Sequence, residues 1–223
     1  MKLIHTSDNH GDSFFYLDII FEDADIIVNS GDFLPSITME ERWKCKNESE
    51  IHYAETIYQH KWMMDHMDAF KDTIDKSAFV LCPGNHDYYN PIPDMIKAGI
   101  DAYDINQKMK TIKGLSFYGF PFIPFIGGNW NYEKEPDDMR EWVKIIPEGI
   151  DILVAHCPPA NILCESFDGK DGGNAALANW LSYGCEKLPK MVLSGHFHKT
   201  HGIETYMNMK ISNAATVVHS FDL

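Results

Sequence analysis

Seven side chains that can bind metal ions stand just after short apolar runs in this chain of 223 residues. They occur in five strings: Ser-Asp-Asn-His-Gly (7–11), Ser-Gly-Asp (30–32), Gly-Asn-His-Asp (84–87), Ala-His-Cys-Pro-Pro (155–159) and Gly-His-Phe-His (195–198). Carboxylate, imidazole and amide-oxygen ligands suit Mn²⁺, Fe or Zn²⁺, and no Cys-x-x-Cys pair offers a thiolate site instead. The sequence therefore predicts a two-metal hydrolase site, and the candidate ligands are Asp8, His10, Asp32, Asn85, His156, His196 and His198.

The spacing within two of these strings has a physical interpretation. One residue separates the ligands in Asp-x-His (8–10) and in His-x-His (196–198). In an extended strand, side chains two residues apart leave the chain on the same side, so each pair can point into one cavity. Gly31, Gly84 and Gly195 precede a ligand, and a missing Cβ there lets the backbone approach a metal or a phosphate.

The five strings, in this order, resemble the calcineurin-like metallophosphoesterase superfamily. Its pattern is D-x-H, G-D, G-N-H-[DE], a lone His and G-H-x-H, and every element is present. The stretches 119–124, 130–132 and 145–147 are similar to the small metallophosphoesterase-domain-containing phosphodiesterases described from animal brain. The His-Gly-Pro-Pro of that subfamily appears here as His-Cys-Pro-Pro (156–159).

The resemblance implies a role for each candidate residue. One metal is expected on Asp8, His10 and His198, and the other on Asn85, His156 and His196, with Asp32 bridging the two. His86 would be the histidine outside the ligand set that stabilises the developing charge or protonates the leaving oxygen. Asp87 would orient His86.

The resemblance also implies a reaction. We expect two divalent metal ions, with Mn²⁺ as the first choice and Fe, Zn²⁺ or Ni²⁺ as alternatives, and a metal-bound hydroxide that attacks phosphorus in line. The expected substrate is a small nucleotide-like phosphodiester. The alternatives are a phosphomonoesterase acting on a nucleotide or metabolite, a nuclease, and a catalytically inactive scaffold of the same fold.

Composition limits the partners. The formal net charge of −14 disfavours binding of extended nucleic acid, so a small phosphate ester is the expected partner. No apolar run approaches the ~20 residues of a membrane span. The five cysteines are odd in number and form no Cys-x-x-Cys pair, which favours free thiols and a cytoplasmic location.

The order of apolar segments predicts the fold. Strands alternate with helical segments, which indicates parallel pairing in covered sheets. We expect a single domain over residues 1–223 of class α/β (α+β): a four-layer α-β-β-α sandwich of two facing mixed β-sheets flanked by helices, with a helical insertion at about 38–76. Strands are predicted at 2–6, 26–29, 78–82, 110–113, 115–118, 150–155 and 191–194, short antiparallel strands at 202–219, and helices at 14–21, 48–70 and 175–181.

Three further segments have competing interpretations. The aromatic stretch 117–132 either caps the core or supplies a wall of the substrate pocket. In the second case the wall residue would be Phe122, Phe125, Trp130 or Tyr132. The segment 168–174 is either a turn ending in a helix cap or a loop whose backbone N–H groups and Lys170 face the phosphate. The residues Trp62, Met63, Met64 and Met67 are expected in the core, and binding of a cofactor or partner is the alternative.

Overall fold

The first of two large sheets contains the N-terminal strand. The structure is a computed structural model that describes residues 1–11, 23–74 and 76–223. This sheet has the strand order β13-β1-β2-β3-β4, in which β1 to β4 are parallel and β13 joins β1 in antiparallel orientation. Its strands are β1 (Lys2–Thr6), β2 (Ile26–Asn29), β3 (Ala78–Leu81), β4 (Ala102–Asp104) and β13 (Val218–Asp222).

The second large sheet faces the first and is also mixed. Its order is β11-β12-β10-β9-β6-β5, with four parallel strands in the centre and one antiparallel strand at each edge. A separate two-stranded sheet pairs β7 (Ile123–Pro124) with β8 (Glu133–Lys134). The strands of the second sheet are β5 (Met109–Ile112), β6 (Leu115–Phe120), β9 (Ile152–Ala155), β10 (Met191–Ser194), β11 (Gly202–Tyr206) and β12 (Met209–Asn213).

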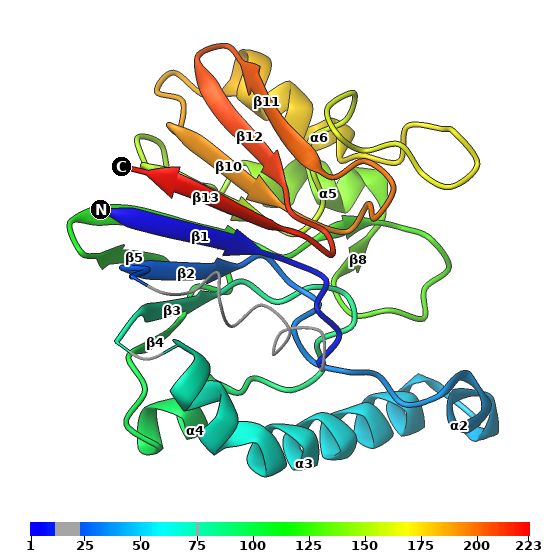
Figure 1. The fold of residues 1–223 in the computed structure, drawn as a ribbon. Helices are drawn as coiled ribbons and strands as arrows, with labels where there is room; N and C mark the ends of the chain where they lie inside the picture. Colours follow the sequence, from blue (N-terminus) through cyan, green and yellow to red (C-terminus); the bar gives the residue numbers. More distant parts are fainter. Residues whose placement is uncertain (12–22, 75) are drawn as a thin grey trace.

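Helices cover the outer face of each sheet (Figure 1). On the first sheet lie α3 and α4, while α5 and α6 lie on the second. A short helix, α2, precedes α3 and begins with a capping box between Thr38 and Glu41. The helices are α2 (Met39–Lys44), α3 (Glu48–Ile74), α4 (Ile92–Lys97), α5 (Pro136–Val143), α6 (Ala175–Asn179) and the π-helix η2 (Trp180–Gly184).

Alternation along the strands divides the apolar residues among separate cores. Leu3 faces the second sheet and belongs to the core between the sheets, whereas Ile4 belongs to the core under α3. On the neighbouring strand Ile26 and Val28 face the second sheet and Ile27 faces α3. A third core lies between the second sheet and α5, α6 and η2. Both faces of each sheet are therefore covered, as expected for central parallel strands.

The predicted α-β-β-α sandwich is confirmed, and some details differ. Residues 202–213 form the predicted antiparallel pair, but the chain then crosses to the first sheet, where β13 pairs with β1. Met64 was wrongly expected in the core, because it lies on the outer side of α3 and is 50% exposed. The predicted helix at 14–21 lies outside the described residues. No helix in the part of the chain that the structure describes is long and apolar enough to cross a membrane.

Candidate metal centre

The predicted ligands follow the carboxyl ends of five parallel strands. The strand β1 leads to Asp8 and His10, β2 to Asp32, and β3 to Asn85. On the second sheet, His156 follows β9 directly, and the His-x-His pair (196–198) follows β10. Because neighbouring parallel strands end at the same edge of a sheet, loops far apart in the sequence meet there.

Two overlapping groups of these residues could each hold a cation. Asp8, His10 and His198 form one group, and Asp8, Asp32 and His156 form the other. Within each group the ligand atoms all lie within 4.8 Å of one another. The Nε2 atom of His198 is 3.1 Å from Oδ1 of Asp8, and Nε2 of His156 is 3.5 Å from Oδ2 of Asp32.

The other two predicted ligands lie beside these groups. Oδ1 of Asn85 is 3.0 Å from Nε2 of His156. The ring of His196 is 5.1 Å from that of His156, and its backbone N–H donates to Oδ2 of Asp8 at 2.8 Å. The fold thus brings all seven predicted residues to one place, with His156 and Asp8 as the common neighbours.

The backbone of the ligand loops is not extended. The φ angles are 55° for Asp8, 48° for His10, 53° for Asp32 and 67° for His196, all in the left-handed region. The expectation that each ligand pair projects from a strand is therefore wrong, since β1 ends at Thr6 and β10 at Ser194. A left-handed backbone costs roughly 1–3 kcal/mol per non-glycine residue, and such strain is concentrated at functional sites.

Glycines make room for the ligand side chains. A Cβ on Gly195 would lie 1.8 Å from Oγ of Ser7 and 2.2 Å from Oδ2 of Asp8. A Cβ on Gly84 would lie 2.3 Å from Oδ1 of Asp32. The absent side chains therefore admit the ligands themselves, which refines the expectation that they admit a metal or a phosphate.

The charges of the cluster favour cation binding. Asp8 and Asp32 are each only 2% exposed, and their ion-pair partners are His198 and His156. Burial opposes ionisation of Asp32, but the neighbouring His156, His86 and His10 together outweigh it and hold the pKa of this carboxyl well below its usual range. Burial by itself lowers the pKa of His156. The Asp32 and Asp8 carboxylates more than offset this effect and raise the pKa to about 9.

Two buried carboxylates thus attract positive charge, and among the described residues their ion-pair partners are the histidines His198 and His156. Buried carboxylates need close cationic partners. Burial lowers the pKa of His196 to about 4, so this imidazole is neutral near pH 7 and offers a lone pair. A set of carboxylates, neutral imidazoles and an amide oxygen fits two divalent cations.

His86 lies next to the cluster with a defined set of neighbours. Its Nδ1 is 2.9 Å from the Ser36 hydroxyl, and its backbone N–H donates to Oδ1 of Asp32 at 2.7 Å. The ring centroid is 4.9 Å from that of His10 and 4.2 Å from that of Trp130. Among the hydrogen bonds of the described residues none uses Nε2 of His86.

Asp87 acts on the backbone of the loops. It is 3% exposed, and its carboxylate accepts N–H donors from Gly84 at 2.8 Å, Leu34 at 3.0 Å and Phe33 at 3.3 Å. Ser36, and not Asp87, is the side chain bonded to the imidazole of His86. Asp87 therefore joins the loop after β2 to the loop after β3, on which Asp32 and Asn85 stand.

The aromatic stretch separates into core and site residues. Phe122 is 3% exposed and packs against the side chains of Tyr132 and Trp142 in the core under α5. Phe125 is 49% exposed. Of the four aromatic residues considered for a pocket wall, Trp130 is the one whose ring contacts His86.

The segment 168–174 is a turn whose donors are used internally. Asn174 caps α6 by accepting the N–H of Leu177 at 2.9 Å. The N–H of Gly173 donates to Asp171, and Lys170 pairs with Asp168 at 2.7 Å. These contacts support the turn and cap, and they contradict the interpretation of a loop that presents free N–H groups to phosphate.

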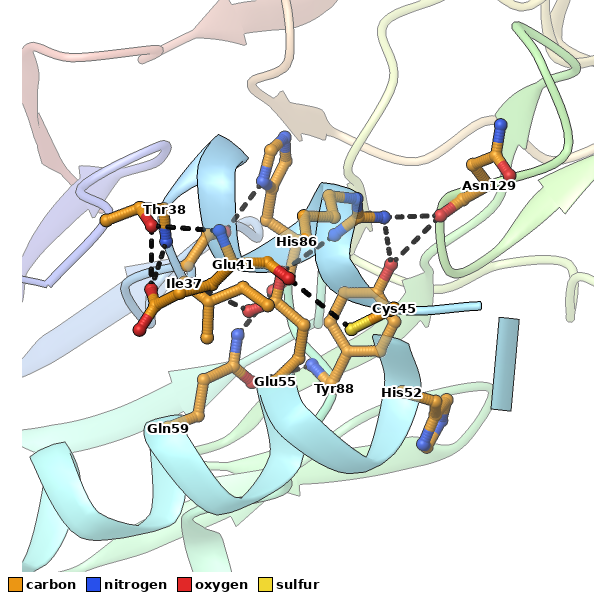
Figure 2. A network of polar contacts seen from close by, with 12 residues as sticks. Ile37, Thr38, Glu41, Cys45, His52, Glu55, Gln59, His86, Tyr88 and Asn129 are labelled. Carbon is orange, nitrogen blue, oxygen red and sulfur yellow. Dashed lines mark hydrogen bonds and ion pairs between the residues drawn. The ribbon is translucent and has the colours of Figure 1, made fainter. Parts of the chain in front are cut away.

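Sequence reasoning missed the polar residues that support His86. Glu55 and Gln59 of α3 are fully buried, and Figure 2 shows their side chains pointing toward Ile37 and the loop of His86. Arg42 of α2 is 7% exposed and belongs to the same network. Positions 55, 59 and 63 are four residues apart and therefore lie on one face of the helix. Two polar residues on the face that carries the buried Met63 were the sequence signal that could have revealed this network.

Comparisons with known proteins agree with this geometry. The family model described as calcineurin-like phosphoesterase matches residues 1–200. The protein named UPF0046 protein K07C11.7, from Caenorhabditis elegans, is 24% identical over 96% of this chain and 69% of its own length. The human protein named metallophosphoesterase domain-containing protein 1 is 29% identical over 45% of this chain and 32% of its own.

The fold comparison is consistent with the family match. One solved crystal structure superposes with a TM-score of 0.65 at 15% identity, covering 96% of this chain and 90% of that one. At this identity the likeness concerns the fold alone. The subfamily resemblance seen in the sequence is supported by the names of the relatives.

Proposed function

The chain belongs to the calcineurin-like phosphoesterase family, and from this premise we propose that it is a dinuclear-metal phosphodiesterase acting on a small nucleotide-like ester. One observation carries the proposal: two metal-binding groups share Asp8, and the ring of His86 lies against that of the candidate ligand His10. Phosphoester hydrolysis follows from the family, and the diester preference is the proposed part.

We propose the distribution of the two metals among these residues that the family resemblance implies. Asp8, His10 and His198 would hold one cation, and Asn85, His156 and His196 the other, with Asp32 between them. Divalent cations supply acidity to bound water and polarise phosphoryl oxygens. We propose Mn²⁺ as the native pair because carboxylate, amide and imidazole ligands suit it; Fe, Zn²⁺ and Ni²⁺ are the alternatives.

His86 would act on the leaving oxygen. A Ser36 hydroxyl that donates to Nδ1 would keep the proton of the neutral ring on Nε2, where it can form a hydrogen bond to the negative charge that develops on the leaving oxygen. Burial lowers the pKa of His86, which favours this neutral ring. A positioned hydrogen-bond donor to developing negative charge contributes ~10²–10³-fold to turnover.

The substrate is proposed to be small. With a net charge of −14 the chain as a whole repels a long polyanion, while a bound metal pair would make the site itself positive. A phosphomonoesterase acting on a nucleotide or metabolite is the alternative. The seven intact ligand positions argue against an inactive scaffold.

A comparison of two chromogenic esters tests the diester preference. The Mn²⁺-loaded protein should hydrolyse bis-p-nitrophenyl phosphate faster than p-nitrophenyl phosphate, and EDTA should abolish both reactions. Activity on the monoester alone would replace the proposal with the phosphomonoesterase. With metal bound, absence of both activities would reject this hydrolase proposal for simple aryl esters.

We also propose a cytoplasmic location on the basis of the cysteines. All five are free thiols, and burial raises the pKa of both Cys82 and Cys157, which keeps them protonated. Reduced thiols persist in the cytosol. Cell fractionation tests the location, and recovery of the protein in a secreted fraction would contradict it.

A further inference from the structure

The imidazole of His86 contacts side chains from three loops. Ser36 contacts Nδ1, and the His10 ring meets the His86 ring edge-on at an interplanar angle of 84°. The Trp130 ring lies 4.2 Å away at 39°. Ser36 and His10 follow the strands of the first sheet, but Trp130 comes from the loop between β7 and β8. The orientation of His86 therefore depends on how that loop is held.

Arg42 holds that loop. Its guanidinium carbon is 4.0 Å from the centroid of the Trp130 ring, which is a cation–π contact, and Nη2 donates to the carbonyl of Asn129 at 2.5 Å. Nη2 also donates to the hydroxyl of Tyr88 at 3.1 Å, two residues beyond His86. Arg42 of α2 therefore contacts both the backbone carbonyl of Asn129 and the ring of Trp130. The Asn129 and Tyr88 partners of its Nη2 atom are labelled in Figure 2.

Arg42 is itself fixed from α3. Nη1 of Arg42 donates to Oε1 of Glu55 at 2.7 Å, and Oε2 of Glu55 accepts the N–H of Ile37 at 3.0 Å. One helical turn later, Gln59 donates to the carbonyl of His86 at 2.6 Å and accepts the N–H of Tyr88 at 2.7 Å. Helix α3 thus supports the loop of Ser36 and the loop of His86 together.

The burial of this ion pair needs an explanation. Arg42 and Glu55 are 7% and 0% exposed, and apolar replacements of a buried pair are often as stable as the pair itself. The directional contacts to Asn129, Tyr88 and Ile37 cannot be made by apolar side chains. The arrangement therefore serves to place specific groups.

We propose that Arg42 and Trp130 are positioning residues for the imidazole of His86: the Arg42–Glu55 ion pair holds Trp130 against the ring, so that Nε2 meets the leaving oxygen. Trp130 is occupied by Arg42 and His86, which assigns it to orientation and not to stacking on the substrate. The inference rests on the proposed function, because it needs a leaving oxygen for His86 to act upon.

Two variants and one control test the inference. Trp130→Leu removes the ring, and Arg42→Met combined with Glu55→Gln removes both charges without leaving one buried alone. Trp43→Ala is the matched control, because this tryptophan of α2 is 77% exposed. Each variant is compared with the Mn²⁺-loaded wild type on bis-p-nitrophenyl phosphate and on diphenyl phosphate, whose leaving phenolate is more basic and depends more on stabilisation. The comparison is repeated in a His86→Ala background, and bound Mn²⁺ is measured throughout.

The inference predicts a selective effect. The kcat for diphenyl phosphate should fall about 10- to 100-fold in both variants, less than the ~10²–10³-fold expected for loss of the His86 donor itself, while Mn²⁺ content and KM stay unchanged. The nitrophenyl diester should lose less, and neither change should have a further effect in the His86→Ala background, as expected for coupled residues. The control should match the wild type.

Other outcomes separate the two proposals. A wild type that hydrolyses neither diester overturns the proposed function and the inference with it. Three outcomes overturn the inference and leave the proposed function standing, provided that the wild type turns over the diesters. The variants lose equally on both diesters, or their KM rises while kcat is unchanged, or their effects add to that of His86→Ala.

Discussion

Oδ1 of Asp32 accepts a hydrogen bond from the backbone N–H of His86 at 2.7 Å. The residue expected to bridge the metals therefore also holds the residue expected to act on the leaving group. The link uses the backbone of His86, so it survives any change to the His86 side chain. It does not survive loss of the Asp32 carboxylate.

This asymmetry predicts different results for two alanine variants. His86→Ala should keep both metals and lose ~10²–10³-fold in turnover, since only the hydrogen-bond donor to the leaving oxygen is removed. Asp32→Ala should lose metal as well as turnover. Metal analysis of the Mn²⁺-loaded proteins, together with kcat for bis-p-nitrophenyl phosphate, checks both. Equal loss of metal in the two variants would contradict the separation of roles.

Gly195 offers a steric test of the metal centre. In Gly195→Ala the new Cβ would collide with Ser7 and with Oδ2 of Asp8, so metal binding should be lost or strongly weakened. Gly114→Ala is the matched control: its Cβ meets nothing within 4 Å, and only the left-handed φ of 87° is penalised, by about 1–2 kcal/mol. Calorimetric Mn²⁺ titration of both variants measures the difference. Unchanged affinity in Gly195→Ala would show that the ligand loops can move apart.

Asp87 should matter for stability. In Asp87→Ala the N–H groups of Gly84, Leu34 and Phe33 lose their acceptor, and a buried unsatisfied group costs about 1–3 kcal/mol. We expect the urea midpoint to fall together with turnover. A variant of unchanged stability that only loses turnover would instead support the role as an orienter of His86.

Asp151 provides a pH-dependent test of the second sheet. Lys190 and the Ser116 N–H and hydroxyl hold the pKa of this carboxyl at about 2, below its unfolded value near 3.8. A depressed pKa stabilises the fold above the unfolded value, and the contribution is lost as pH falls through 3.8 toward 2. Asp151→Asn should therefore destabilise more at pH 7 than at pH 3. Urea unfolding at both pH values measures this, and an equal loss at both would contradict it.

Much of the fold could be predicted because apolar runs and ligands alternate so regularly. The strand at Lys2–Thr6 and the one at Met191–Ser194 have the predicted bounds, since each is a buried run that ends before a ligand string. The short strands β7 and β8, two residues each, were missed, because so few residues carry no periodicity. The crossing of β13 to the first sheet was missed for a different reason: pairing partners are set by tertiary packing.

Some features of the candidate site could likewise be predicted from the sequence, and others could not. Ligand identities follow from local strings, so the seven residues could be named before their geometry was known. The left-handed loops could not be predicted, because Asp8, His10 and His196 adopt φ values that only their surroundings impose. The residues that support His86 could not be predicted either, because they are far apart in the sequence. Trp130 contacts His86, and Arg42 contacts Trp130 and Glu55.

The central claim is that one cluster binds two cations and uses them to hydrolyse phosphodiesters. The most direct test is to measure Mn²⁺ bound per chain by equilibrium dialysis while following bis-p-nitrophenyl phosphate turnover across the same titration. The account predicts saturation at two ions per chain, turnover that rises with their binding, and loss of both on EDTA treatment. Turnover that persists without metal, or a fully loaded protein that leaves the diester intact, would contradict it.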